Sequence, residues 1–141
     1  MAKNGFSMSN RVAVESVSAA KTLTADDCGK HFLINASASA NYTVTLPTVA
    51  EAGEGWNATF LVETSGTVAK SVTISKASSD TSGVIKLRQL VTSTNAGGEA
   101  DTRSTVVFAA ANLTVGDRLE VVAGTSNWYA TGITSGSLTG S

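Results

Sequence analysis

The stretch from Gly116 to Gly132, GDRLEVVAGTSNWYATG, constrains the fold of this chain more than any other. Two apolar runs flank a short polar break at residues 124–127, which begins with Gly and ends with Asn. Both residue types tolerate the left-handed backbone of a tight turn, so the break predicts a β-hairpin. A loop of even length across this break pairs Ala123 with Trp128.

This pairing assigns the side chains of the hairpin to two faces. Residues that lie directly opposite each other in an antiparallel pair share a face. The face expected to meet the core carries Leu119, Val121, Ala123, Trp128 and Ala130. The other face carries Glu120, Val122, Tyr129 and Thr131. Val122 and Tyr129 therefore form an outward pair, and they are our candidates for a subunit interface.

The same alternation recurs in short runs along the rest of the chain. The run Tyr42–Leu46 alternates apolar and hydroxyl side chains, and Pro47 ends it because proline cannot donate to a ladder. The other expected strands are Val12–Val17, His31–Asn35, Trp56–Thr64, Ser71–Ser75, Val84–Val91 and Ser104–Ala109. Only single helical turns are expected, after Thr24 and Thr48. Roughly eight to ten short strands predict an all-β fold, either an antiparallel β-sandwich or a jelly-roll or barrel-like domain.

Composition limits the chain to one domain and a few function classes. Its 141 residues are 42% hydrophobic and 15% charged, with a formal net charge of −1. A net charge this small gives little repulsion between copies of the chain, which favours a protein that assembles. A low-charge extracellular domain would have the same composition. Without a basic excess or a long apolar run, we expect no nucleic-acid or membrane partner. The opening MAKNGFSMSNR lacks the apolar core of a secretion signal.

Three segments differ in packing potential. Residues 1–20 are interpreted as an interacting N-terminal arm, in which Met1–Arg11 is either frayed or lies on a neighbouring protein. Residues 21–133 are predicted to form a single β domain, and residues 134–141 a flexible tail. The longest break in the pattern, Thr92–Arg103, is expected to be an exposed loop. Its candidate contact residues are Asn95, Gly97, Gly98, Glu99 and Asp101.

No reaction chemistry is evident in the side chains. One Cys and one His are too few for a structural zinc site, and the acidic pairs lack the spacing of a calcium loop. Cys28 and His31 are the only nucleophile–base pair, but a lone Cys in a β domain is more often a small hydrophobic residue. Trp56 and Trp128 fall on core-facing positions rather than on a sugar-stacking platform. We therefore predict no catalytic residue, cofactor or metal, and a cysteine-dependent enzyme is the weakest alternative.

Four short motifs carry a resemblance to a known family. They are LTADDCGKHFLIN, the proline-closed strand YTVTLP, the strand WNATFLVE, and the hairpin GDRLEVVAG–TSNWYATG. In this order they span residues 21–132 and resemble the capsid decoration (cement) proteins of tailed bacteriophages. More loosely, the closing hairpin is similar to those of small β-rich phage head-fibre and tail-fibre modules.

The resemblance implies a structural virion protein rather than an enzyme. Such proteins bind the outside of an expanded capsid, commonly as trimers, and stabilise the shell by bridging capsomers. The implied partners are the major capsid protein and other copies of this chain in a homotrimer, and the implied location is the virion exterior after synthesis in the host cytoplasm. Family contacts often come from arms and loops, which makes Lys3, Phe6 and Arg11 candidate capsid contacts. The alternative is a tail-fibre or head-fibre module whose 92–103 loop recognises a host-surface glycan.

Overall fold

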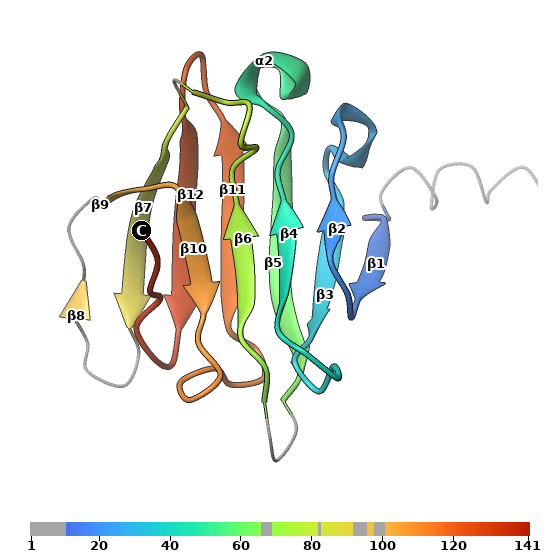
Figure 1. Ribbon diagram of the computed structural model, residues 1–141, viewed down its shortest axis with the longest axis vertical. Helices are drawn as coiled ribbons and strands as arrows, with labels where there is room; N and C mark the ends of the chain where they lie inside the picture. Colours follow the sequence, from blue (N-terminus) through green and yellow to red (C-terminus); the bar gives the residue numbers. More distant parts are fainter. Residues whose placement is uncertain (1–10, 66–68, 82, 92–95, 98–100) are drawn as a thin grey trace, which may run out of the picture.

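The computed structural model describes residues 11–65, 69–81, 83–91, 96–97 and 101–141 (Figure 1). Almost all of its regular structure is β-strand. The first half contains β1 (Val14–Val17), β2 (Lys21–Thr22), the 3-10 turn η1 (Ala25–Asp27), β3 (His31–Asn35), β4 (Tyr42–Thr45), α2 (Val49–Ala52) and β5 (Asn57–Thr64). The second half contains β6 (Val72–Ser75), β7 (Ile85–Val91), β8 (Ala96–Gly97), β9 (Asp101–Arg103), β10 (Thr105–Phe108), β11 (Arg118–Ala123) and β12 (Trp128–Thr134). The chain is all-β, as predicted.

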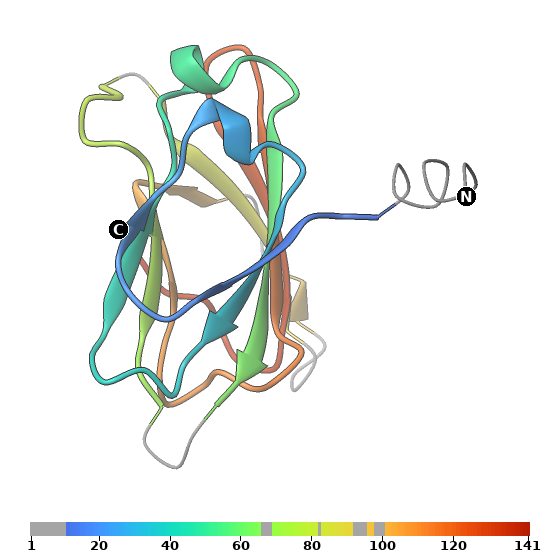
Figure 2. The same cartoon turned by 90° about the vertical axis from the view of Figure 1, so that its right-hand side faces the viewer.

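The strands form two sheets that lie as two layers (Figures 1 and 2). The eight-stranded sheet has the order β1-β3-β5-β11-β12-β7-β8, and β9 also pairs with β7. The four-stranded sheet has the order β10-β6-β4-β2. Buried apolar residues from both sheets belong to one cluster, so the core is the layer between the sheets.

The predicted antiparallel arrangement is wrong, because both sheets are mixed. From β1 to β6 the chain alternates between the sheets, so each strand returns to its own sheet after a pass through the other. Two passes restore the original direction, and β1 therefore pairs with β3, and β3 with β5, in parallel. In the smaller sheet β2, β4 and β6 are parallel for the same reason. Side-chain alternation along a strand does not reveal this crossing.

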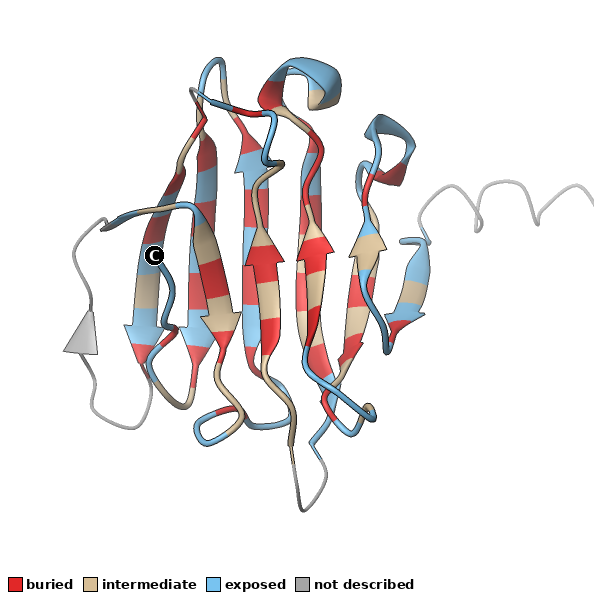
Figure 3. Ribbon diagram, in the orientation of Figure 1, coloured by how far each residue is buried: buried red, intermediate tan, exposed pale blue. Residues whose placement is uncertain are grey.

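The predicted closing hairpin lies in the middle of the larger sheet. Its register pairs Ala123 with Trp128 and Val121 with Ala130, as expected from an even-length loop. β11 pairs antiparallel with β5, whereas β12 pairs in parallel with β7. Trp128 is 0% exposed, and buried and exposed residues alternate along both strands (Figure 3). The hairpin thus lies between β5 and β7 and connects them within the larger sheet.

Aromatic side chains fill the core at two places. Phe32 of β3 stacks on Phe60 of β5 with ring centroids 5.5 Å apart. Trp56 and Trp128 meet edge to face at 5.3 Å, a preferred geometry for aromatic pairs. Trp56 is 2% exposed, so both tryptophans are core residues, as their positions in the alternation predicted.

A buried aspartate, Asp117, stabilises the turn that precedes β11. Asp117 precedes β11, and its carboxylate accepts hydrogen bonds from the backbone N–H of Thr114 at 2.9 Å and of Ser135 at 2.8 Å. The Ser135 hydroxyl donates to the same carboxylate. Asp117 is 6% exposed, so these bonds offset the cost of burying its charge. They fix the start of β11 to the segment that follows β12.

The segment expected to be a flexible tail, residues 134–141, packs against the rest of the molecule. Leu138 is 4% exposed. The Cδ1 atom of Leu138 would lie 2.9 Å from a Cβ added at Gly132. Thr139 forms a bridge with Val107 of β10, so this segment covers the outer edge of the smaller sheet. The Gly/Ser/Thr composition of this segment did not predict the packing, because the packing depends on the single apolar residue Leu138 and on backbone pairing at Thr139.

The N-terminal range and the expected long loop both contain strands. Within residues 1–20, β1 confirms the strand expected at Val12–Val17 and is hydrogen-bonded in the larger sheet. The range expected to be a long loop, Thr92–Arg103, includes β8 and β9, which both pair antiparallel with β7. The short helical turns expected after Thr24 and Thr48 are both present, each with a capping box.

Replacing Asp117 with alanine should lower the free energy of unfolding by about 2 kcal/mol, because the Thr114 and Ser135 donors lose their acceptor. Urea denaturation monitored by tryptophan fluorescence would measure this change. The exposed Glu54→Ala is the matched control and should remain within about 0.5 kcal/mol of the wild type. Equal stability of both variants would contradict the role of Asp117.

Candidate functional site

The outer face of the eight-stranded sheet exposes two pairs of large apolar side chains. We define the outer face by Val122, Tyr129, Ile133 and Leu90, which point away from the core. Val122 is 42% exposed and Tyr129 is 50% exposed, and the two are direct register partners. This confirms that they share a face, as the hairpin register predicted.

A second apolar pair lies further along β12 and on the neighbouring strand β7. Ile133 and Leu90 are register partners on β12 and β7, with exposures of 44% and 46%. Arg118 lies opposite Ile133 and forms an exposed ion pair with Glu120 at 2.7 Å. An exposed pair of this kind contributes little stability, so these charges remain available to a partner.

The outer face also contains a shallow hollow beside Val122. Its volume is about 330 Å³, and it lies over β3, β5 and β11 where His31, Thr59 and Glu120 are register neighbours. The small side chain of Thr59 between two longer ones leaves this space. Apolar projections and a hollow therefore occur on one face.

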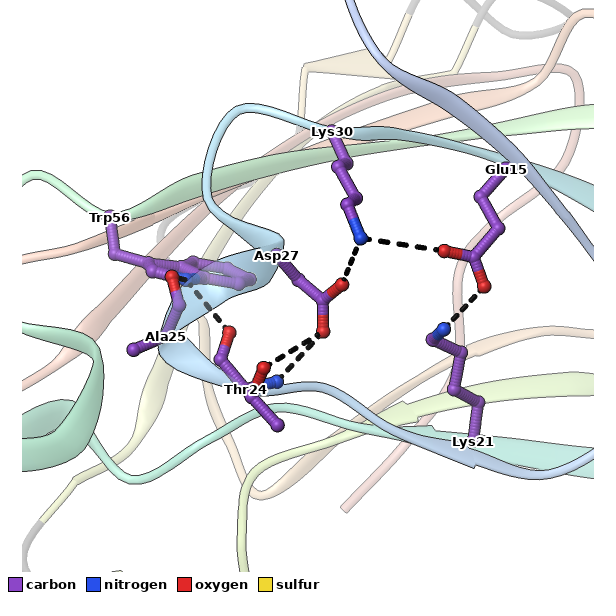
Figure 4. A network of polar contacts seen from close by, with 7 residues as sticks. All are labelled: Glu15, Lys21, Thr24, Ala25, Asp27, Lys30 and Trp56. Carbon is purple, nitrogen blue, oxygen red and sulfur yellow. Dashed lines mark hydrogen bonds and ion pairs between the residues drawn. The ribbon is translucent and has the colours of Figure 1, made fainter.

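A charged network lies at the β1 edge of the molecule (Figure 4). Glu15 of β1 pairs with Lys21 of β2, and the Lys30 ammonium lies 3.6 Å from the other oxygen of Glu15. Lys30 also donates to Asp27 at 2.6 Å. Because β1 and β2 belong to different sheets, Glu15 and Lys21 join the two layers at this edge.

Asp27 connects this network to the turn η1. Its carboxylate accepts from the Thr24 backbone N–H at 2.9 Å and is 7% exposed. Burial raises the pKa of Asp27, but the hydrogen bonds from Lys30 and Thr24 outweigh it, so the pKa lies below its ordinary value. The Trp56 indole N–H donates to the carbonyl oxygens of Thr24 and Ala25, both at 3.2 Å, and holds η1 on the core.

Tyr42 fastens the ends of three strands together. Its hydroxyl donates to the Val17 carbonyl at 2.7 Å and approaches the Asn35 carbonyl at 3.2 Å. Burial raises the pKa of Tyr42 to about 12, so this hydroxyl stays protonated and a donor at neutral pH. The bond fixes the end of β1, the strand that follows the N-terminal segment.

A groove of about 800 Å³ opens at one end of the four-stranded sheet. It is lined by Thr22, Leu23, Thr24, Ala25, Thr45, Leu46, Pro47, Glu51, Ala77, Ser78 and Ser79. These residues come from the β2–η1 segment, the end of β4, α2 and the loop after β6. The sequence offered no signal for this groove, because its walls are brought together only by the crossing of the chain between sheets.

Cys28 and His31, the candidate nucleophile–base pair, share no hydrogen bond in the described part of the chain. Cys28 is an exposed free thiol, and no hydrogen bond between described residues involves its sulfur or the His31 ring. No group of three or more His, Cys, Asp or Glu side chains is close enough to hold a metal ion among these residues. None of the helices in the described residues is long and apolar enough to cross a membrane.

The remaining candidate residues are only partly described. Lys3 and Phe6 lie outside the described residues, whereas Arg11 is exposed just before β1. Asn95, Gly98 and Glu99 also lie outside them. Gly97 belongs to β8 and Asp101 begins β9, so both are placed at the β7 side of the larger sheet.

Stability should fall in acid when Asp27 becomes protonated. Its folded pKa is depressed, so its stabilising contribution is present above the ordinary value of 3.8 and is lost as the pH falls through the lower folded value. Asp27→Asn should therefore destabilise the protein at pH 6 and lessen the loss of stability on acidification. Thermal unfolding at a series of pH values measures both effects. Asn at the neighbouring exposed Asp26 is the control, and an identical pH profile for the two variants would contradict the prediction.

Comparison with known proteins adds no relative to these observations. No protein-family model, curated protein or solved structure matches the chain.

Proposed function

We propose that this chain is a structural virion protein that binds the outer surface of a tailed-phage capsid as a homo-oligomer and stabilises the shell by bridging capsomers. The proposal combines the motif resemblance with one structural observation. That observation is the outer face, where Val122, Tyr129, Ile133 and Leu90 are exposed on a broad sheet. Exposed apolar clusters on a sheet are typical of surfaces that meet another protein.

The outer face supports self-association because it carries projections and a hollow together. Tyr129 projects from β12, and the hollow beside Val122 lies on the same sheet within reach of a facing copy. Aromatic side chains that enter a hollow are common anchors of interfaces. We propose a trimer, because closed symmetry gives several weak capsid contacts the avidity of one assembly. In this proposal the fold is a β-sandwich, and its larger sheet faces the neighbouring subunits.

The N-terminal segment is the proposed capsid contact, with Lys3, Phe6 and Arg11 as its contact residues. The strand that follows it is held at three points: by pairing with β3, by the Glu15–Lys21 ion pair and by the Tyr42 hydroxyl. A contact segment transmits force to the fold only if its attachment is fixed. The major capsid protein is the proposed partner and the capsid exterior the proposed location. No role is proposed for nucleic acid or membrane.

Replacing Val122 and Tyr129 together with threonine should weaken self-association about tenfold or more, because the apolar contact is lost while β propensity is kept. Sedimentation velocity over a range of concentrations measures the change. Val115→Thr is the matched control, since Val115 is 56% exposed but lies outside the sheets. A wild-type protein that stays monomeric throughout would overturn the proposed interface.

Deleting residues 1–11 should reduce retention on expanded capsids while leaving thermal unfolding unchanged. The fold should survive because the described backbone hydrogen bonds begin after the deleted residues. The first involves Ala13, whose carbonyl accepts from His31 N–H at 2.8 Å. Co-sedimentation with capsids built from the accompanying major capsid protein measures retention. The charge-only variant Lys3→Ser with Arg11→Ser separates ionic from apolar contacts. Full retention of the truncated protein would exclude the segment as the capsid contact.

A further inference from the structure

We propose that the groove at the end of the four-stranded sheet is a binding site for an uncharged carbohydrate. The groove lies on a different sheet from the outer face, so this site is independent of the proposed self-association. Its volume of about 800 Å³ is within the range of sites that hold a small organic ligand. Figure 2 shows η1, α2 and the loop between β6 and β7 gathered at this end of the molecule.

The lining has the chemistry that a sugar requires. Thr22, Thr45, Ser78 and Ser79 each present a hydroxyl group that makes no hydrogen bond to another described residue. Each such hydroxyl can donate one hydrogen bond and accept others, which matches the mixed donors and acceptors of a saccharide. The apolar part of the lining comes from leucine, alanine and proline, against which the C–H face of a sugar ring can pack.

The charge of the lining excludes several other ligands. Glu51 is its only ionisable residue. Hydrogen bonds from the Thr48 backbone N–H and hydroxyl lower the pKa of Glu51, so it is ionised at neutral pH. A groove with one carboxylate and no cation repels phosphates, nucleotides and acidic sugars. Hydroxyls around the apolar part make it a poor site for a purely apolar molecule.

The walls of the groove are held in place by buried side chains. Asp80 is 7% exposed, and its carboxylate accepts from Val49 N–H at 3.0 Å and from Gly83 N–H at 2.9 Å. These bonds fasten the loop after β6 to α2. A Cβ at position 83 would lie 2.4 Å from the same carboxylate, so a larger residue there would displace Asp80.

The opposite wall, η1, is fastened in a similar way. Asp27 accepts the Thr24 N–H, and the Trp56 indole donates to the Thr24 and Ala25 carbonyl oxygens. Each wall is therefore fixed by a buried group that itself does not line the groove. Walls fixed in advance lower the entropy cost of binding.

The test is an array of neutral, amino and acidic oligosaccharides probed with the full chain, followed by titration of a bound glycan monitored by NMR. We expect neutral glycans to bind and to shift the amide signals of the groove residues. The double variant Thr45→Val with Ser79→Ala should bind about tenfold more weakly, since it loses up to two hydrogen bonds.

The matched control is Thr43→Val with Thr73→Val, which are register partners on the same side of the four-stranded sheet but do not line the groove. It should bind like the wild type. If the groove variant fails to fold, Thr22→Val at the edge strand replaces it. The proposal is overturned if no glycan binds, if only acidic glycans bind, or if the groove variant keeps wild-type affinity.

Retention on capsids serves as a separate readout. The groove variants should keep full retention, whereas deletion of residues 1–11 should keep glycan binding. The carbohydrate site and the capsid role can therefore fail independently of each other.

Discussion

The apolar layer between the two sheets is the constraint on which the rest of the structure depends. Strands in both sheets bury alternate residues in this layer, where Phe32, Phe60 and Trp128 are fully or almost fully buried. Burial on this scale is the main favourable contribution to folding in a chain whose only cysteine is a free thiol. Because one face of each strand is committed to the layer, the other face is free to carry function.

Much of the secondary structure could be predicted because the alternation of side chains has a period of two. The hairpin is the clearest case: an even-length loop fixed its register and placed Trp128 inward and Tyr129 outward, as observed. The direction of strand pairing could not be predicted, because burial requires only that a strand has an apolar face. Parallel and antiparallel neighbours satisfy that requirement equally well.

The candidate surfaces differ in how far the sequence revealed them. Val122 and Tyr129 were accessible to prediction because they follow from local pairing within one hairpin. The groove was not, since Thr22, Glu51 and Ser79 come from separate passes of the chain. The packing of Leu138 was missed for a related reason, because its contact with Gly132 depends on where the chain turns after β12.

The position of the closing hairpin has a consequence for how this protein is made. β11 and β12 lie between β5 and β7, yet they come after both in the sequence. A ribosome therefore releases β5 and β7 before the two strands that join them exist. Until residues near 134 emerge, both strands present unpaired backbone edges to solvent, which are sites for association with other chains. The larger sheet is thus completed only after β12, the last of its strands in the sequence, has been synthesised.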